Sequence, residues 1–200
     1  MNRPLTIVAA TSNKGKLREL RQLLSGLDIT VLSMAEAGVS ADIEETGTTF
    51  EENAMLKAEG VMRLCGLPTF ADDSGLSVDA LNGAPGVYSA RYAGENATDR
   101  DRTLKLLDAV KDIPDEKRGA HFVSAIAFAS PDGKSFTVTG KCFGVITREI
   151  QGENGFGYDP IFLVPEYNKT FGQMPDEIKN KISHRAEAMR LFLQKIKEYI

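Results

Sequence analysis

Cysteine and histidine are scarce in this 200-residue chain, which carries only two of each. Cys65 and Cys142 lie far apart, without the Cys-x-x-Cys spacing of a metal or redox site and without a nearby histidine. A secreted disulfide scaffold of this length usually carries more cysteines. A structural zinc site is disfavoured because only His121 and His184 are available as histidine ligands. We therefore predict two reduced thiols packed within the protein.

Long apolar runs are also missing. No stretch approaches the roughly 18 residues of a membrane-spanning helix. The N-terminal run Leu5–Ala10 is too short for a signal-peptide core, and Lys14 and Lys16 follow it closely. The net charge of −4 disfavours nonspecific binding to nucleic acid, which relies on a broad basic surface. These features predict a cytoplasmic protein that binds neither membrane nor nucleic acid.

The composition is that of a globular protein, with 42% hydrophobic and 26% charged residues. The chain has no internal repeat, low-complexity tract or long linker, so we predict one domain over residues 1–200. A buried strand at 5–10, a helix after Thr11–Asn13 and a strand at Asp28–Leu32 indicate a strand–helix–strand start. The hairpin signal Pro131-Asp132-Gly133 joins two consecutive strands, so the pattern predicts an α/β fold with a mixed sheet.

Helix signals mark other parts of the chain. Thr48–Glu51 has the form of a capping box, with a hydroxyl at the cap and a carboxylate three residues on, and the helix that it opens closes at Gly66. The segment Thr69–Ala71 reads as a short strand that runs into an acidic turn, Asp72–Gly75. Ser183 is expected to cap the last helix.

The turn Thr11-Ser12-Asn13-Lys14-Gly15-Lys16 joins a buried strand to a helix start. Such a turn directs free backbone N–H groups and the positive end of the helix dipole at one spot, which suits a phosphate. Lys16 would add a charge for a triphosphate, while Ser12 and Asn13 offer hydrogen bonds. The turn matches neither the P-loop nor Gly-x-Gly-x-x-Gly, so a solvated helix N-terminus is an equal alternative.

The adjacent carboxylates of Asp72 and Asp73 repel each other unless a cation or hydrogen-bond donors compensate. The apolar segments on both sides look buried, which disfavours the alternative of a solvated turn. Magnesium favours oxygen ligands and usually takes one or two carboxylates, completing its shell with waters and substrate phosphates. One aspartate would hold the metal and accept a proton from the attacking water, and Ser74 would orient phosphate oxygens. A second acidic pair, Glu44-Glu45, lies in a linker, where most such pairs are solvated.

Two further groups of residues suit a nucleobase. Gly155–Asp159 places two aromatic rings around a glycine, and stacking of such rings on a base is worth roughly 1–3 kcal/mol each. A packed loop is the equal alternative for this segment. Lys179, His184 and Arg185 set cationic donors at a helix start, where the helix dipole disfavours them unless an anion or a base carbonyl is bound.

Seven segments of the chain, in order and nearly from end to end, resemble the motifs of the inosine triphosphate pyrophosphatase family. This is the Ham1/RdgB-like group of noncanonical purine nucleoside triphosphate pyrophosphatases. The segments are Thr11–Glu19, Glu44–Gly47, Phe50–Ala58, Ala71–Gly75, Gly83–Tyr92, Gly155–Phe162 and Ile182–Arg185. Seven motifs in one order are far more specific than any one of them.

The resemblance implies an elongated α/β fold, with a long mixed central sheet flanked by helices, an active-site cleft between two lobes, and a homodimer. It implies Mg²⁺-dependent hydrolysis of ITP, dITP and XTP to the monophosphate and pyrophosphate, which removes deaminated purines from the nucleotide pool. By the matching motifs, Asp73 is the catalytic proton acceptor and a magnesium ligand, and Glu44 is a second ligand. The implied substrate-binding residues are Thr11, Ser12, Asn13, Lys14, Gly15, Lys16 and Ser74 for the triphosphate and sugar, Phe156, Gly157, Tyr158 and Asp159 around the base, and Lys179, His184 and Arg185 as base readers.

A donor from Arg185 or Lys179 to the 6-oxo group would favour hypoxanthine and xanthine over adenine, whose amino group would oppose a buried cation at a cost of a few kcal/mol. Guanine shares the 6-oxo group, so its exclusion must come from its 2-amino group. Other functions remain open. A regulatory nucleotide-binding module without turnover does not account for the paired carboxylates. An aspartyl phosphatase usually has Asp-x-Asp at a strand end, which Asp72-Asp73-Ser74 does not supply. A third alternative is a house-cleaning enzyme for modified pyrimidines.

Overall fold

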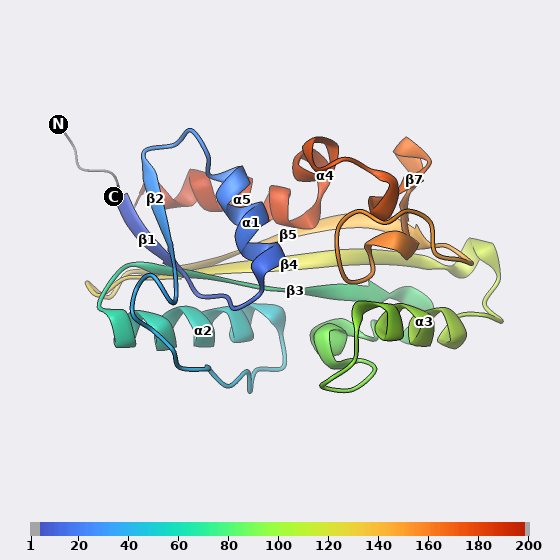
Figure 1. Cartoon of the computed structure of the whole chain (residues 1–200), viewed down its shortest axis with the longest axis horizontal. Helices are drawn as coiled ribbons and strands as arrows, with labels where there is room; N and C mark the ends of the chain where they lie inside the picture. Colours follow the sequence, from blue (N-terminus) through green and yellow to red (C-terminus); the bar gives the residue numbers. More distant parts are fainter. Residues whose placement is uncertain (1–4, 199–200) are drawn as a thin grey trace. The chain divides into compact units, whose positions relative to one another are not determined.

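The computed structural model describes residues 5–198, and within them seven strands form one sheet in the order β2-β1-β3-β4-β5-β6-β7 (Figure 1). The strands are β1 (Leu5–Ala9), β2 (Ile29–Ser33), β3 (Thr69–Val78), β4 (Gly119–Ala129), β5 (Ser135–Ile146), β6 (Phe162–Val164) and β7 (Lys169–Thr170). β1 pairs in parallel with β2 and β3, whereas β6 pairs antiparallel with β5 and β7. The predicted α/β fold with a mixed sheet is therefore confirmed.

Helices accompany the sheet, and the described residues form two compact units. The α-helices are α1 (Lys14–Leu23), α2 (Phe50–Cys65), α3 (Asp99–Ala109), α4 (Asp176–Ile182) and α5 (His184–Ile196). None of the helices in the described part combines the length and the apolarity needed to cross a membrane. One unit contains the described residues up to Asp73, the segment Ser124–Gly140 and the described residues from Arg185 onward; the other contains Ser74–Val123 and Lys141–His184. The single domain over residues 1–200 stays a prediction, and its first four and last two positions lie outside the described residues.

The first unit has an apolar cluster on each face of its part of the sheet, because successive strand side chains point to opposite faces. α1 and α5 cover one face and α2 covers the other (Figure 1). Large side chains fill the α1 and α5 side: Ile7, Leu20, Leu24, Phe70, Ile126, Phe128, Met189 and Phe192. Small ones dominate the α2 side: Ala54, Ala58, Ala71, Ala125, Ala127 and Ala129, with Val8 and Val61. The alternation of Phe70 with Ala71 and of Ile126 with Ala127 thus decides which helix each face accepts.

α2 begins with a capping box one residue later than predicted. Its N-cap is Thr49, whose hydroxyl accepts from the Glu52 N–H, while the Glu52 carboxylate accepts from the Thr49 N–H, each at 3.1 Å. The predicted pair, Thr48 and Glu51, is therefore wrong; the N–H and hydroxyl of Thr48 donate to the same Glu52 carboxylate instead. The helix ends as predicted at Gly66, whose φ of 66° lies in the left-handed region that glycine adopts without strain.

The acidic residues expected in a turn lie instead inside a strand. β3 runs without interruption from Thr69 to Val78, so Asp72–Gly75 is extended and the predicted acidic turn is wrong. β3 lies between β1 and β4 in the sheet, so this segment takes the extended conformation of a sheet strand instead of a local turn. Most positions of this strand are buried, including the two aspartates. Their carboxylates therefore face the interior rather than solvent.

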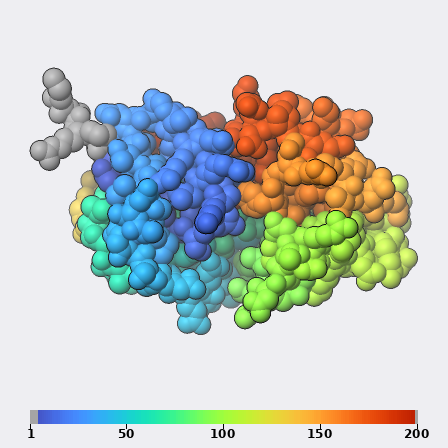
Figure 2. Space-filling model, in the orientation of Figure 1, coloured from blue at the N-terminus to red at the C-terminus, as the bar shows by residue number. Residues whose placement is uncertain are grey.

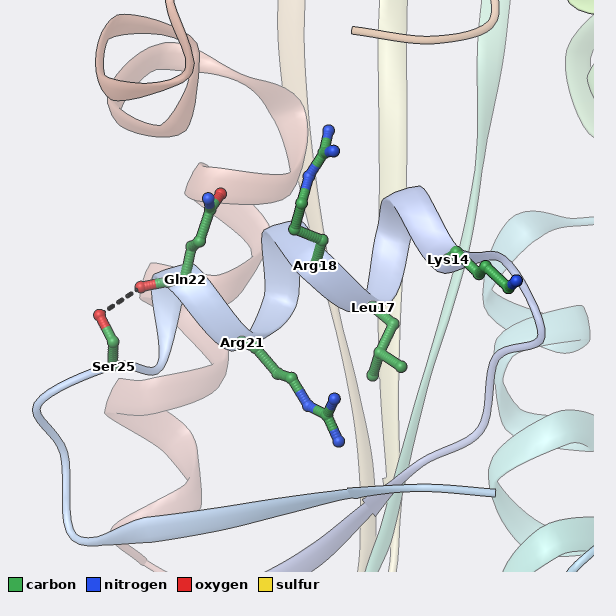
Figure 3. A pocket seen from close by; sticks show the side chains of 6 residues that line it. All are labelled: Lys14, Leu17, Arg18, Arg21, Gln22 and Ser25. Carbon is green, nitrogen blue, oxygen red and sulfur yellow. Dashed lines mark hydrogen bonds between the residues drawn. The ribbon is translucent and has the colours of Figure 1, made fainter. Parts of the chain in front are cut away.

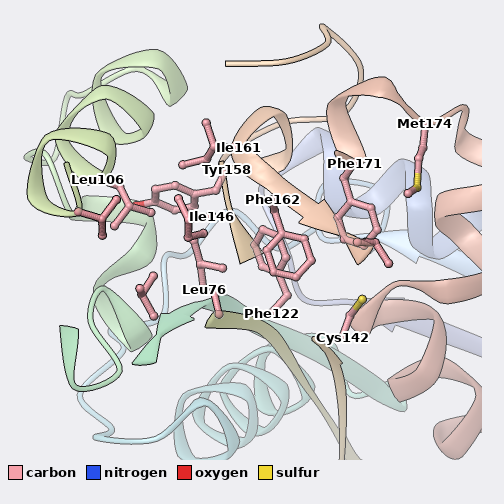
Figure 4. Packing of buried hydrophobic residues seen from close by; sticks show 14 residues of the cluster. Leu76, Leu106, Phe122, Cys142, Ile146, Tyr158, Ile161, Phe162, Phe171 and Met174 are labelled. Atoms are coloured by element: carbon pink, nitrogen blue, oxygen red, sulfur yellow. The ribbon is translucent and has the colours of Figure 1, made fainter. Parts of the chain in front are cut away.

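The second unit is built on a separate apolar cluster, drawn in Figure 4. The ring of Phe122 packs against Phe162, with 4.6 Å between ring centroids, and against Phe171 at 6.0 Å. α3 contributes Leu106 to this cluster. The buried Tyr158 hydroxyl donates to the carbonyl of Ser89 at 2.9 Å, which ties the glycine-rich loop to the 3-10 turn Gly86–Arg91.

The approach to the last helix also differs from prediction. A short helix, α4, precedes α5. Ser183 is the C-cap of α4 and also directly precedes the first residue of α5, His184, which is the position predicted for it. Lys179 lies in the last turn of α4, where the helix dipole favours a cation, so its predicted place at a helix start is wrong. Both cysteines are free thiols as predicted, with Cys142 buried and Cys65 half-buried.

Candidate active site

Asp72 is the centre of a buried charge network in the first unit. Its side chain has no exposed surface and accepts from Lys16 Nζ at 2.9 Å, from Arg185 at 3.4 Å and from the Ser124 hydroxyl. Burial alone would raise the pKa of Asp72, but Arg185 and Lys16 hold it well below its usual range. The carboxylate therefore stays ionised and compensates two buried cations.

Arg185 is wholly buried and binds a second carboxylate, that of Glu19 on α1. This guanidinium thus joins α1, β3 and the start of α5. The sequence predicts that an anion or a base carbonyl offsets the unfavourable helix dipole at Arg185. In the structure, Glu19 and Asp72 supply that negative charge from within the chain.

Asp73 points into a second group of charges beside the first. Its Oδ1 atom lies 3.3 Å from Lys57 Nζ, which also binds Glu45 at 3.0 Å and the Asp72 carbonyl at 3.1 Å. The Oδ2 atom of Asp73 is buried and has no hydrogen-bond partner among residues 5–198. Burial raises the pKa of Asp73, and the positive charges of Lys57 and Lys16 offset only part of that increase. The site therefore contains a buried carboxylate, one oxygen of which makes no hydrogen bond within the described residues.

Glu45, in the linker before α2, is connected to Asp73 by Lys57, which binds both carboxylates. Burial lowers the pKa of Lys57, but the charges of Asp73 and Glu45 outweigh it and raise that pKa above its usual value. Glu44, the predicted metal ligand, is an exposed side chain. The N–H of Gly47 in the same linker donates to Asn53 Oδ1 on α2 at 2.8 Å, which anchors the linker to the helix.

The predicted phosphate turn leads into α1 as expected. Asn13 is the N-cap, and its Oδ1 atom accepts from the Lys16 N–H at 3.1 Å. Ser12, Asn13 and Lys14 are exposed, and the blue N-terminal part of the chain that includes this turn forms part of the molecular surface in Figure 2. Burial lowers the pKa of Lys16, and Asp72 offsets part of this effect. The turn therefore combines exposed polar groups with one lysine directed at β3.

A surface hollow of about 430 Å³ is lined by residues of α1 and the turn after it (Figure 3). Its lining residues are Lys14, Leu17, Arg18, Arg21, Gln22 and Ser25. The side chains of Arg18 and Arg21 point in different directions, and Arg21 binds Glu36. These cations do not converge on one point, unlike the charged groups around Asp73.

The second unit holds the remaining candidates in a loop and a buried ion pair. Lys179 Nζ lies 2.8 Å from Asp159 Oδ2, and both side chains are almost fully buried. The same ammonium lies over the rings of Phe156, at 4.8 Å from the centroid, and Phe171, at 5.7 Å. Asp159 also accepts from the Phe156 N–H at 2.8 Å. A Cβ atom at Gly155 would collide with that carboxylate, which explains the glycine there.

The aromatic residues of this unit divide into packed and accessible rings. Tyr158 and His184 are both buried, and the His184 ring stacks on Phe122 with centroids 4.7 Å apart. Phe156 is only half-buried. Of the two rings expected around the glycine, Phe156 is therefore the more accessible one, and the Tyr158 ring belongs to the core.

Asp73, Lys16 and Arg185 are site residues predicted from the sequence, and the structure adds side chains that bind them and were not predicted. Lys57 is the main omission, although a lysine among the apolar residues Ala54–Ala58 is a detectable signal for a buried charge. Glu19 could not be recognised, because nothing local distinguishes it from a solvated helix glutamate.

The Asp73 carboxylate suits a metal ion that prefers oxygen ligands. Within the described residues, no group of three or more His, Cys, Asp or Glu side chains is arranged to hold an ion. Mg²⁺ is commonly held by one or two carboxylates, with water and substrate phosphates completing its shell. The free Oδ2 atom of Asp73 fits this arrangement.

Comparison with known proteins gives full-length matches. The model of the Ham1 family matches residues 7–195. A Geobacter sulfurreducens protein named dITP/XTP pyrophosphatase is 50% identical over 185 residues, which cover 92% of this chain and 93% of that protein. A Salmonella paratyphi A protein of the same name is 49% identical over 193 residues, or 96% and 98% of the two chains.

Solved structures match equally well. A HAM1 protein from Coxiella burnetii has a TM-score of 0.88 at 45% identity, covering 97% of this chain and 99% of that one. The Staphylococcus aureus Ham1 protein has a TM-score of 0.87 at 42% identity, covering 98% and 100%. At this identity and coverage, the likeness extends beyond the fold to the sequence of nearly the whole chain.

Proposed function

The chain belongs to the Ham1 family, and on that premise we propose that it hydrolyses noncanonical purine nucleoside triphosphates, ITP, dITP and XTP, to the monophosphate and pyrophosphate. The names of its relatives support the substrate class. The observation that carries the chemistry is the buried Asp73 carboxylate, which lies beside Lys57 and has one oxygen without a partner among the described residues. Such a reaction would remove deaminated purines from the nucleotide pool.

Asp73 is assigned the role of proton acceptor. Cleavage between the α- and β-phosphates needs a water that loses its proton as it attacks. A carboxylate whose pKa is raised by burial is a stronger base than a solvated one, and the neighbouring Lys57 charge offsets part of that increase. The Asp73 carboxylate, one of whose oxygens makes no hydrogen bond within the described residues, would take up that proton.

The triphosphate is assigned to the turn Thr11–Lys16, with Ser74 as a further contact. Lys16 and Lys57 place positive charge beside the reacting carboxylate, which would stabilise the charge that develops on leaving pyrophosphate. Asp72 holds the Lys16 ammonium at 2.9 Å and so orients it. The exposed side chains of Ser12, Asn13 and Lys14 are open to a ligand.

Mg²⁺ is the proposed cofactor, held by Asp73 and Glu44. Bound there, it would polarise phosphate oxygens and offset the charge of the triphosphate. The exposed Glu44 carboxylate stays open to an incoming ion, whereas Glu45 is engaged by Lys57. We also propose that the protein acts in the cytoplasm as a homodimer, as the family resemblance implies.

The base is assigned to the second unit's loop, Phe156–Asp159, and to three basic residues. Phe156 offers the more accessible ring for stacking, and Gly157 permits close approach. Lys179, His184 and Arg185 are assigned to recognition of the purine, where a donor to the 6-oxo group would favour hypoxanthine and xanthine over adenine.

Product analysis tests the proposal. The protein is incubated with Mg²⁺ and each of ITP, XTP, dITP, GTP, ATP and dUTP, and the products are separated. Release of IMP and pyrophosphate from ITP is the expected result. Formation of IDP and phosphate would identify a phosphatase, preference for dUTP a pyrimidine enzyme, and absence of turnover a binding module; each would overturn the proposal.

The role of Asp73 is tested with Asp73→Asn. This variant should fold and bind ITP but lose at least about 100-fold in kcat, because general-base catalysis contributes roughly that much or more. Asp132→Asn, at an exposed carboxylate that binds Lys134, serves as the matched control and should keep wild-type kcat. Near-wild-type turnover by Asp73→Asn would remove Asp73 from the mechanism.

A further inference from the structure

The backbone of Gly157 is held on both sides by α3. The Gly157 N–H donates to Asp99 Oδ2 at 2.8 Å, and the Gly157 carbonyl accepts from the Thr103 hydroxyl at 3.2 Å. Asp99 and Thr103 are four residues apart on α3 and therefore lie on one side of the helix. Two contacts to both backbone groups of a single residue fix the position of the loop at that point.

Asp99 is not needed to cap its own helix. The N-cap of α3 is Thr98, which forms a capping box with Asp101, and the Asp101 carboxylate accepts from both the N–H and the hydroxyl of Thr98. Asp99 has its second oxygen paired with Arg102, which holds the carboxylate in place beside Gly157. In the first turn of α3, Asp101 therefore caps the helix while Asp99 binds the backbone of Gly157.

The same loop carries the groups assigned to the base. Residues on either side of Gly157 are Phe156, whose ring lies over the Lys179 ammonium, and Tyr158, whose hydroxyl is bound to Ser89. The backbone of Phe156 is fixed by Asp159, which also pairs with Lys179. A shift of Gly157 would therefore move the Phe156 ring relative to the Lys179 charge.

We propose that Asp99 and Thr103 are positioning residues that clamp the base-binding loop through Gly157 and so contribute to purine affinity. This inference rests on the proposed function, since it takes Phe156–Asp159 as the loop that contacts the base. Gly157 has a φ of 62°, which lies in the left-handed region. An unrestrained glycine adopts this and several other backbone conformations. The two hydrogen bonds hold Gly157 in one of these conformations before the substrate binds. The loop therefore loses less conformational entropy when the nucleotide binds.

Loss of the clamp should raise KM for the nucleotide and leave kcat nearly unchanged. Asp99→Ala removes the acceptor for the Gly157 N–H, and KM for ITP should rise about 3- to 10-fold, as expected for one lost hydrogen bond. Thr103→Val removes the second contact without changing the shape of the side chain and should act in the same direction. Asp99→Asn keeps an acceptor oxygen and should restore KM to near the wild-type value.

Asp101→Ala is the matched control, because it removes the capping carboxylate from the same helix turn without a contact to Gly157. It should lower the melting temperature more than Asp99→Ala does, yet leave KM for ITP unchanged. Inorganic tripolyphosphate, which has no base, provides a second control as a competitive inhibitor. Its inhibition constant should be the same in wild type, Asp99→Ala and Thr103→Val.

A measurement without substrate separates this inference from the proposed function. Amide hydrogen exchange in the peptide containing Gly157 should be faster in Asp99→Ala than in wild type or Asp101→Ala. If wild type does not hydrolyse ITP, the proposed function fails while the exchange data still report on the clamp. If wild type is active but Asp99→Ala shows neither a raised KM nor faster exchange, the clamp is overturned alone. Equal effects of Asp99→Ala and Asp101→Ala on KM would also overturn it.

Discussion

Asp72→Asn removes a negative charge shared by Lys16 and Arg185 in a place with no exposure to solvent. Removing one partner from a buried ion pair commonly costs about 3–5 kcal/mol, because the remaining charge is left uncompensated. Arg185 keeps Glu19 as a partner, and asparagine can still accept from the Ser124 hydroxyl. We therefore expect a loss near the lower limit, about 3 kcal/mol in the free energy of unfolding.

Urea unfolding at pH 7, followed by circular dichroism, measures this loss. With a slope of about 2 kcal/mol per molar urea, a loss of about 3 kcal/mol lowers the midpoint by about 1.5 M. The control is Glu59→Gln, which breaks the exposed ion pair with Arg63 on α2 and should shift the midpoint far less. A loss below about 1 kcal/mol for Asp72→Asn would refute the conclusion that its charge compensates the buried cations.

Two further perturbations test the second unit. Burial raises the pKa of the Cys142 thiol to about 11, so only about one molecule in a thousand carries the Cys142 thiolate at pH 8. Iodoacetamide should therefore modify Cys65 before Cys142, as measured by mass spectrometry of the peptides. Because a raised pKa means that reactivity appears only as pH rises, faster labelling of Cys142 in the folded protein at pH 8 would contradict its buried position. Gly144→Ala would place a Cβ atom 2.5 Å from the Leu163 carbonyl oxygen and should lower the free energy of unfolding by about 1–3 kcal/mol; an unchanged urea midpoint would contradict that packing.

Local patterns predicted the elements whose signals are complete within a few residues. β1 and α1 follow from an apolar run, a polar turn and a spaced leucine stripe, and the end of α2 follows from Gly66. The capping box was displaced by one position because two threonines and two glutamates offer the same spacing, and only the path of the preceding linker distinguishes them.

β3 shows why a local pattern fails within a sheet. Asp72-Asp73-Ser74-Gly75 has the composition of a turn, since these residues compete with the backbone for hydrogen bonds in isolated segments. In the protein, these residues lie within β3 between β1 and β4, and buried cations from α1, α2 and α5 compensate the two carboxylates. Neither contribution is visible in the segment itself.

The sequence by itself determined the α/β class, the mixed sheet, the family and the identity of Asp73 as the candidate reactive group, because these depend on periodicity and on motifs that lie along the chain. Only the tertiary structure decided how the charges are paired. Lys57 supports Asp73, Asp72 binds Lys16 and Arg185, and Asp99 reaches Gly157 across 58 positions. Electrostatic and hydrogen-bond contacts act over a few ångströms in space, so partners far apart in sequence are defined only once the chain has folded.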